Sequence, residues 1–136
     1  MNKILAICLL VFSPLVFGLE VSPYPQGKIS LDQWKTYYAE VKKTLSATEK
    51  RVEDQGLVTY SDSTKNVHYA FTLDNHPAHP AWISRVIIDK NGELYVKQLG
   101  YFAGSEPPFA TLFAQYQALN LEMQKWLNEQ RNKKNK

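Results

Sequence analysis

Three predicted strand segments, the last two of them joined by a tight-turn sequence, constrain the fold of this chain most. Apolar and polar residues alternate with a period of two from Val67 to Leu73, and Ala81 to Asp89 becomes apolar on both faces near its end. Asp89 to Gly92 follows, and its Asn-Gly pair tolerates the positive φ of a two-residue hairpin. Leu94 to Tyr101 then returns antiparallel. Together with a β-prone stretch at Leu57 to Tyr60, the pattern predicts about four antiparallel strands.

A helical pattern flanks the strands on each side. The first predicted helix runs from Leu31 to Asp54, begins with a capping box of Ser30 and Gln33, and ends before Gly56. The second begins at 105–108 and ends near 131. Their apolar stripes are Leu31, Trp34, Tyr38, Val41, Leu45 and Val52, and Phe109, Leu112, Tyr116, Leu119, Met123 and Trp126. This order predicts an α+β domain with both stripes in the core and both helices on one face of a curved sheet.

The first eighteen residues have the layout of a secretory signal peptide. Lys3 gives a short positive start, an apolar run extends from Ile4 to Phe12, Ser13-Pro14 breaks it, and Gly18 offers a cleavage site. The run is shorter than the roughly 20 residues of a membrane span, so no stable span is expected after cleavage. We therefore predict a signal peptide at 1–18, an extended arm at 19–29, one domain at 30–131 and a frayed basic tail at 132–136.

The cysteine content and the charge of the chain exclude some classes of function. Cys8 is the only cysteine and lies in the leader, so the cleaved chain has no thiol and excludes disulfides and cysteine catalysis. An exported domain without disulfides fits the bacterial periplasm. The formal net charge is only +3 and its positive part gathers at the tail, so a nucleic-acid partner is not expected. The tail is a solvated end or makes weak contact with anionic surfaces.

Enzyme signatures are missing from this sequence. It has no G-x-S-x-G, no phosphate-binding loop, no dinucleotide fingerprint and no H-E-x-x-H. A serine–histidine–acid set assembled in space stays open, with Ser61, Ser63 and Ser84 as nominal nucleophiles. The missing motifs favour a non-enzymatic protein without a cofactor over an enzyme.

A proline-bracketed loop is the first candidate for recognition. Two prolines within His76-Pro77-Ala78-His79-Pro80 fix φ twice, so the loop is stiff before anything binds. The alternative is a plain connector. The partner-binding candidates are His76, Pro77, His79 and Pro80, with Tyr101 and Phe102 from the segment that leads into the last helix.

The histidines also suggest a metal site. His68, His76 and His79 fall within a short stretch, Asp74 lies among them, and imidazole is a common metal ligand. A zinc or copper site, structural or in a hydrolase, is thus the alternative function, although this spacing is not a strong metal signature. The competing interpretation is a rigid loop with solvent-exposed imidazoles.

The leading hypothesis is a small exported, periplasmic binding or protein-interaction domain. It would hold a periplasmic or cell-envelope protein through the outer face of the sheet and the His-Pro loop, in an inhibitor-like or immunity-like role. A third hypothesis is an envelope stress or assembly factor with a hydrophobic partner. An apolar groove between helix and sheet would favour that hypothesis.

Overall fold

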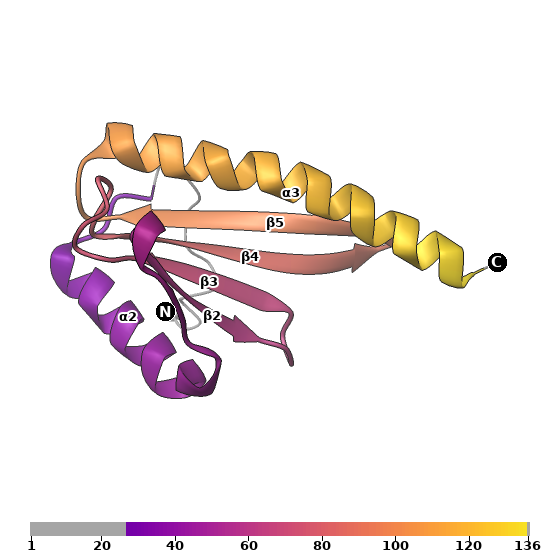
Figure 1. Ribbon diagram of the computed structural model, residues 1–136, viewed down its shortest axis with the longest axis horizontal. Helices are drawn as coiled ribbons and strands as arrows, with labels where there is room; N and C mark the ends of the chain where they lie inside the picture. Colours follow the sequence, from indigo (N-terminus) through magenta and orange to yellow (C-terminus); the bar gives the residue numbers. More distant parts are fainter. Residues whose placement is uncertain (1–26, 136) are drawn as a thin grey trace, which may run out of the picture.

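The computed structural model describes residues 27–135, which form a five-stranded antiparallel sheet between two helices (Figure 1). The elements are α2 (Leu31–Leu45), β1 (Lys50–Val52), β2 (Leu57–Asp62), β3 (Val67–Thr72), β4 (Ala81–Lys90), β5 (Glu93–Phe102) and α3 (Glu106–Lys134), with 3-10 turns at Ser46–Thr48 and Glu53–Gln55. Strand order follows chain order, and each strand pairs antiparallel with the next. The predicted α+β class and antiparallel sheet are confirmed. The predicted signal peptide and most of the predicted arm lie outside the described residues.

The two helices cover opposite faces of the sheet, so the prediction that they share one face is wrong (Figure 1). Residues toward α2 form one core cluster: Trp34, Val58, Tyr60, Phe71, Trp82 and Tyr101. Residues toward α3 form a second: Leu57, Ala70, Ala78, Ala81, Ile83, Phe102, Phe109, Leu112, Phe113 and Tyr116. Because the central strands carry apolar side chains on both faces, each face needs its own helical cover.

The first helix is shorter than predicted, because the chain after Leu45 turns back to build a fifth strand. Thr48 supports this turn twice: its hydroxyl donates to the Leu45 carbonyl at 2.8 Å and accepts from the Ser61 N–H at 2.9 Å. The strand that follows pairs with β2, so sheet pairing replaces the last turns of the predicted helix. Gly56 does adopt a positive φ of 68°, but it ends the short Glu53–Gln55 turn. The capping box of Ser30 and Gln33 is confirmed, with both bonds present.

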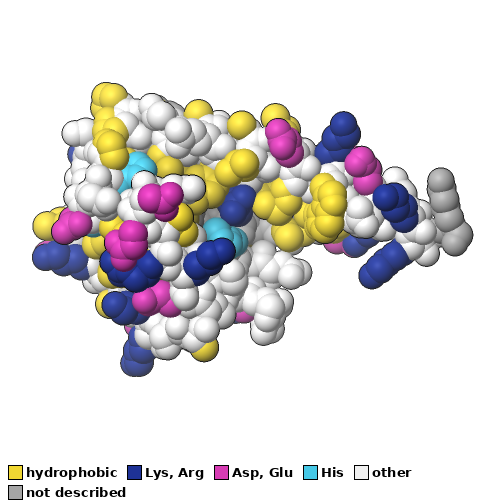
Figure 2. Space-filling model, in the orientation of Figure 1, with side chains coloured by type: hydrophobic (Ala, Val, Ile, Leu, Met, Phe, Trp, Pro, Cys, Tyr) yellow, Lys and Arg dark blue, Asp and Glu magenta, His cyan; other side chains and the backbone are white. Residues whose placement is uncertain are grey.

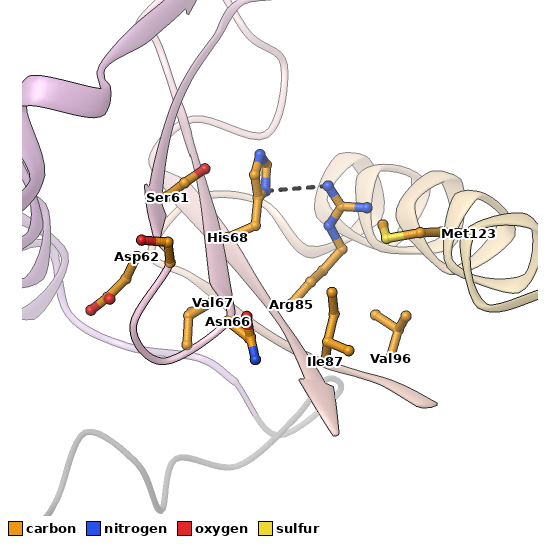
Figure 3. Close-up of a pocket in the computed structure, with 10 residues that line it drawn as sticks. Ser61, Asp62, Asn66, Val67, His68, Arg85, Ile87, Val96 and Met123 are labelled. Atoms are coloured by element: carbon orange, nitrogen blue, oxygen red, sulfur yellow. Dashed lines mark hydrogen bonds between the residues drawn. The ribbon is translucent and has the colours of Figure 1, made fainter. Parts of the chain in front are cut away.

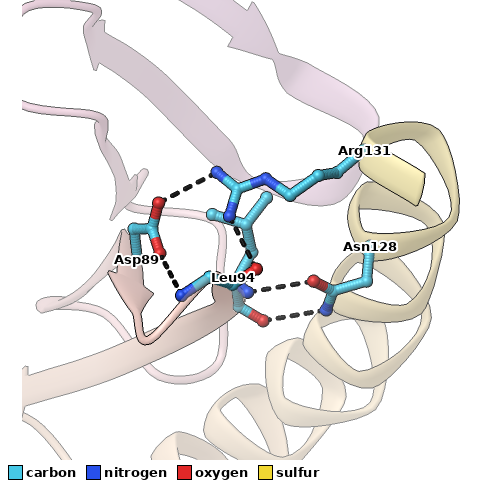
Figure 4. Close-up of polar contacts among 5 residues, drawn as sticks. Asp89, Leu94, Asn128 and Arg131 are labelled. Atoms are coloured by element: carbon cyan, nitrogen blue, oxygen red, sulfur yellow. Dashed lines mark hydrogen bonds and ion pairs between the residues drawn. The ribbon is translucent and has the colours of Figure 1, made fainter. Parts of the chain in front are cut away.

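The C-terminal half of α3 is hydrogen-bonded to the sheet through side-chain amides (Figure 4). The Asn128 side chain accepts from the Leu94 N–H at 2.9 Å and donates to the Leu94 carbonyl at 3.0 Å. One helical turn earlier, Gln124 accepts from the Val96 N–H at 3.1 Å. We call Asn120, Gln124 and Asn128 the amide stripe of α3. Arg131 completes the contact at the β4–β5 turn, where it binds Asp89 at 3.0 Å.

The amide stripe turns the predicted apolar stripe away from the core. Leu119 is 54% exposed and Trp126 is exposed as well, so the prediction that the stripe is core is wrong for these two residues, whereas Met123 is half-buried. Helix α3 also continues to Lys134, past its predicted end near Arg131. No helix in the part of the chain from 27 to 135 has the length and apolar character needed to cross a membrane.

Candidate functional site

Two hollows lie beside α3 on the face of the sheet that this helix covers, and we call them together the α3 groove. Its outer hollow is lined by Gln55, Leu57, His76, Pro77, Leu112, Gln115, Ala118, Leu119 and Glu122. Its inner hollow is lined by Ser61, Asp62, Ser63, Asn66, Val67, His68, Arg85, Ile87, Val96 and Met123. Leu119 and Met123 lie one helical turn apart on α3, so the two hollows follow one another along the helix. Figure 2 shows hydrophobic side chains on this face between two histidines and, further on, over the C-terminal half of α3.

The inner hollow, of about 180 Å³, is bordered by an arginine and a histidine among mostly apolar surface, and we call it the Arg85 pocket. His68 on β3 and Arg85 on β4 are register partners, so both side chains project from the same face of the sheet. The Arg85 Nη2 donates to His68 Nδ1 at 3.2 Å (Figure 3). Met123 from α3 forms the opposite wall.

Further side chains hold the Arg85 guanidinium in place. Its Nη1 donates to Asn120 Oδ1 at 3.3 Å, and its carbon lies 4.7 Å from the centre of the Tyr116 ring. Asn120 in turn donates to Gln98 Oε1, and Gln98 Nε2 donates to the Phe113 carbonyl at 3.0 Å. The guanidinium is therefore oriented by a connected network from α3 and β5.

None of these partners carries a negative charge. Among residues 27–135, the ion pairs within 4.0 Å are Arg51–Glu53 and Arg131–Asp89, and neither includes Arg85. The Arg85 Nε is buried without a hydrogen-bond partner. Burial lowers the pKa of Arg85 from its usual value, yet a guanidinium stays protonated in proteins. The pocket thus contains a partly buried cation without a carboxylate partner.

His68 supplies a neutral donor beside this cation. Burial, assisted by the neighbouring Arg85 charge, lowers the pKa of His68 to about 4. Because Nδ1 accepts from Arg85, the ring proton of the neutral form is assigned to Nε2. This is the reverse of a catalytic triad, in which a carboxylate accepts from Nδ1 and leaves Nε2 as the base for a serine. Ser61 is the register partner of His68, but this tautomer gives it a donor and no base.

The His-Pro loop divides between the groove and the end of the sheet. His76 and Pro77 border the outer hollow, and the His76 Nδ1 accepts from the Ala78 N–H at 2.9 Å. His79 instead faces Thr72, with its Nδ1 2.8 Å from the Thr72 hydroxyl, and its ring lies edge-on to Trp34. Of the loop residues predicted to bind a partner, His76 and Pro77 therefore line the groove.

The other predicted contact residues lie elsewhere. Pro80 is half-buried where the loop enters β4, and its carbonyl accepts from the Ala103 N–H at 2.8 Å. Tyr101 and Phe102 were predicted at a partner-binding rim, but both are buried, Tyr101 in the α2-facing cluster and Phe102 in the α3-facing one. This corrects their assignment: alternation along β5 sends one side chain into each core.

The predicted metal ligands do not come together as one set. His79 is held by Thr72 at the end of β3. Thr72 is four residues after His68 on this strand, which corresponds to a separation of about 13 Å between them. Asp74 is exposed in the turn after β3. Within residues 27–135 no group of three His, Cys, Asp or Glu side chains is arranged to hold a metal ion.

Of the residues that line the Arg85 pocket, the sequence predictions named His68 as a metal ligand, Ser61 and Ser63 as nominal nucleophiles and Met123 as part of a core stripe, but they did not name Arg85. One signal was available: Arg85 stands between Ile83 and Ile87 at a position that alternation assigns to a buried face. Asn120 carries no comparable signal, because a single amide in a polar helix is unremarkable by sequence.

No family model matches this chain, and comparisons with curated proteins and with solved structures gave no match either.

Proposed function

We propose that this protein is an exported, non-enzymatic binding domain that holds a partner protein of the cell envelope in the α3 groove. One observation supports this proposal most: Leu119 is exposed and Met123 is half-buried on the side of α3 that borders the two hollows, because the amide stripe on another side makes the hydrogen bonds with β5. Exposed apolar surface next to a hollow is typical of interaction sites.

The composition of the groove favours binding over catalysis. Methionine is flexible and polarisable, so Met123 can adapt to a partner's side chains. At the other end, Pro77 belongs to a loop whose shape is fixed by its own hydrogen bonds, from the His76 N–H to the Leu73 carbonyl and from the His79 N–H to the His76 carbonyl. A rigid wall loses little entropy when a partner binds. An inhibitor-like or immunity-like role agrees with such a surface.

The export part of the proposal depends on the leader at 1–18. Intact-mass analysis of the protein isolated from its own cells tests it. We expect a chain beginning at Leu19, recovered from the periplasm. A chain that retains Met1 and is recovered with cytosolic proteins would contradict export.

Site-specific photo-crosslinking in cells that export this protein tests the proposed binding surface. A photoreactive amino acid replaces Leu119 in one variant and Leu121 in another. Leu121 is the matched control, because it is 72% exposed on the same helix but borders the opposite side of α3, beside Gln117 and Gln124. We expect an adduct with one exported protein, identified by mass spectrometry, from position 119 only.

A second change then checks that the groove itself is used. Met123→Lys, added to the variant that carries the crosslinker at position 119, should reduce the adduct, because an ammonium on the apolar wall opposes apolar contact. Equal adducts from positions 119 and 121, or no adduct from 119, would refute the groove as the binding surface.

A further inference from the structure

The Arg85 pocket has a charge without a counter-charge, and we infer that it is a binding site for an aliphatic carboxylate. This inference rests on the proposed function, because the carboxylate would belong to the partner polypeptide in the groove. It would be an acidic side chain or a chain terminus next to aliphatic side chains. Arg85 would hold the carboxylate, His68 would border it, and Met123 and its neighbours would contact the aliphatic part.

The donors of the pocket match the acceptors of a carboxylate. A guanidinium has five N–H bonds, and two of them are occupied, one by His68 and one by Asn120. One further N–H on each Nη remains, and a carboxylate pairs with two such donors through its two oxygens. His68 also borders the hollow, but its ring proton is on Nε2, the nitrogen that faces away from Arg85 (Figure 3), so the charge-assisted contacts are those of Arg85.

The surroundings favour a monovalent anion with an apolar body. Val67, Ile87, Val96 and Met123 supply aliphatic and thioether walls. A phosphate dianion would bring more charge than one guanidinium offsets, and its desolvation between such walls would be costly. A carboxylate next to an aliphatic group brings one charge for Arg85 and an apolar surface for the walls.

One acidic residue borders the pocket, but it is engaged elsewhere. The Asp62 Oδ1 accepts from the N–H groups of Thr64 and Lys65 at 3.0 and 3.2 Å, in the turn between β2 and β3. Figure 3 shows its side chain directed away from Arg85. Asp62 therefore does not take the place of the missing counter-charge.

An NMR titration with two matched small probes tests the inference on the full processed chain. Hexanoate carries the carboxylate, and hexanamide has the same carbon chain without the charge. We expect hexanoate to shift the His68 ring and Met123 methyl signals saturably. Hexanamide should bind more weakly by about tenfold or more, because it lacks the charge-assisted hydrogen bonds.

Variants then identify the group that recognises the charge. Arg85→Gln should weaken hexanoate binding by about tenfold or more, whereas Arg85→Lys should retain part of it because it keeps the charge. The matched control is Arg51→Gln, because Arg51 is exposed and already paired with Glu53. That variant should bind hexanoate like the parent.

Two results would overturn the inference: equal binding of hexanoate and hexanamide by the parent, or unchanged hexanoate binding by Arg85→Gln. The probe comparison uses the unaltered protein, so it decides the question even where a variant folds poorly. If either of these results is obtained while residue 119 still gives the position-specific crosslink, the proposed binding function is supported and only the carboxylate site is refuted.

Discussion

Thr72 connects two strands through its side chain, and its removal gives a sharp test of the fold. The β3–β4 pairing ends at Phe71 and Trp82. Beyond that pair, the Thr72 hydroxyl accepts from the Ala81 N–H at 2.9 Å and donates to the Ala81 carbonyl at 3.1 Å. The same oxygen lies 2.8 Å from His79 Nδ1. Thr72 is 2% exposed and Ala81 is fully buried, so water cannot replace these bonds.

Thr72→Val removes the hydroxyl and keeps the shape of the side chain. Both backbone groups of Ala81 that contact the hydroxyl then lose this partner, and each buried unpaired group costs about 1–3 kcal/mol. We therefore expect the free energy of unfolding to fall by roughly 2–5 kcal/mol, which is a large part of the stability of a small domain.

Urea unfolding followed by tryptophan fluorescence and circular dichroism measures this change. Thr59→Val is the matched control on β2, because the Thr59 hydroxyl makes only a 3.4 Å contact with the Lys50 carbonyl near the surface. It should change stability by no more than about 0.5 kcal/mol. If Thr72→Val is within about 1 kcal/mol of Thr59→Val, the hydroxyl does not replace the sheet hydrogen bonds as we argue.

Two further predictions concern buried polar groups. Tyr101→Phe should leave the free energy of unfolding unchanged or raise it by about 1 kcal/mol, because the buried Tyr101 hydroxyl has no hydrogen-bond partner. Tyr60→Phe should lower it by about 1 kcal/mol, because the Tyr60 hydroxyl donates to Glu49 at 2.8 Å. Equal effects of the two changes in urea unfolding would contradict this prediction. Stability should also fall on acidification: the folded-state pKa of His68 is lowered from 6.5 to about 4, so in this window the unfolded chain binds the proton first. The urea concentration at the midpoint of unfolding should therefore be lower at pH 4.5 than at pH 7, and this difference should be smaller in His68→Gln. An identical difference in both proteins would exclude His68 as a source of the pH dependence.

The sequence predicted those elements whose signals are local. Asn91 and Gly92 have φ values of 55° and 82°, as the Asn-Gly turn requires, and the Asp89 carboxylate accepts from the Gly92 N–H. The capping box works for the same reason, since its two residues are only three positions apart. Such patterns depend on neighbours in the chain and need no knowledge of the tertiary structure.

The wrong predictions concern features that are determined by contacts between segments far apart in the sequence. The stripe that includes Leu119 has helical spacing, but spacing alone cannot show that Gln124 and Asn128 on another side of α3 match the backbone of β5. The helices were predicted on one face although Ile83 and Trp82 point to opposite faces of β4, each into its own core. Arg85 was overlooked because its partners come from β3 and α3, far away in the sequence.

The side-chain amides along α3 also decide how this sheet can associate with others. An unpaired outer strand is a template for further strands, and thus for aggregation. Here Gln124 and Asn128 occupy backbone groups at one end of β5, while Gly27 and Ile29 bind Phe102 at the other. The opposite border, β1, is only three residues long and begins with Lys50 and Arg51. Neither border of the sheet therefore offers a long apolar template on which the strand of another chain could pair.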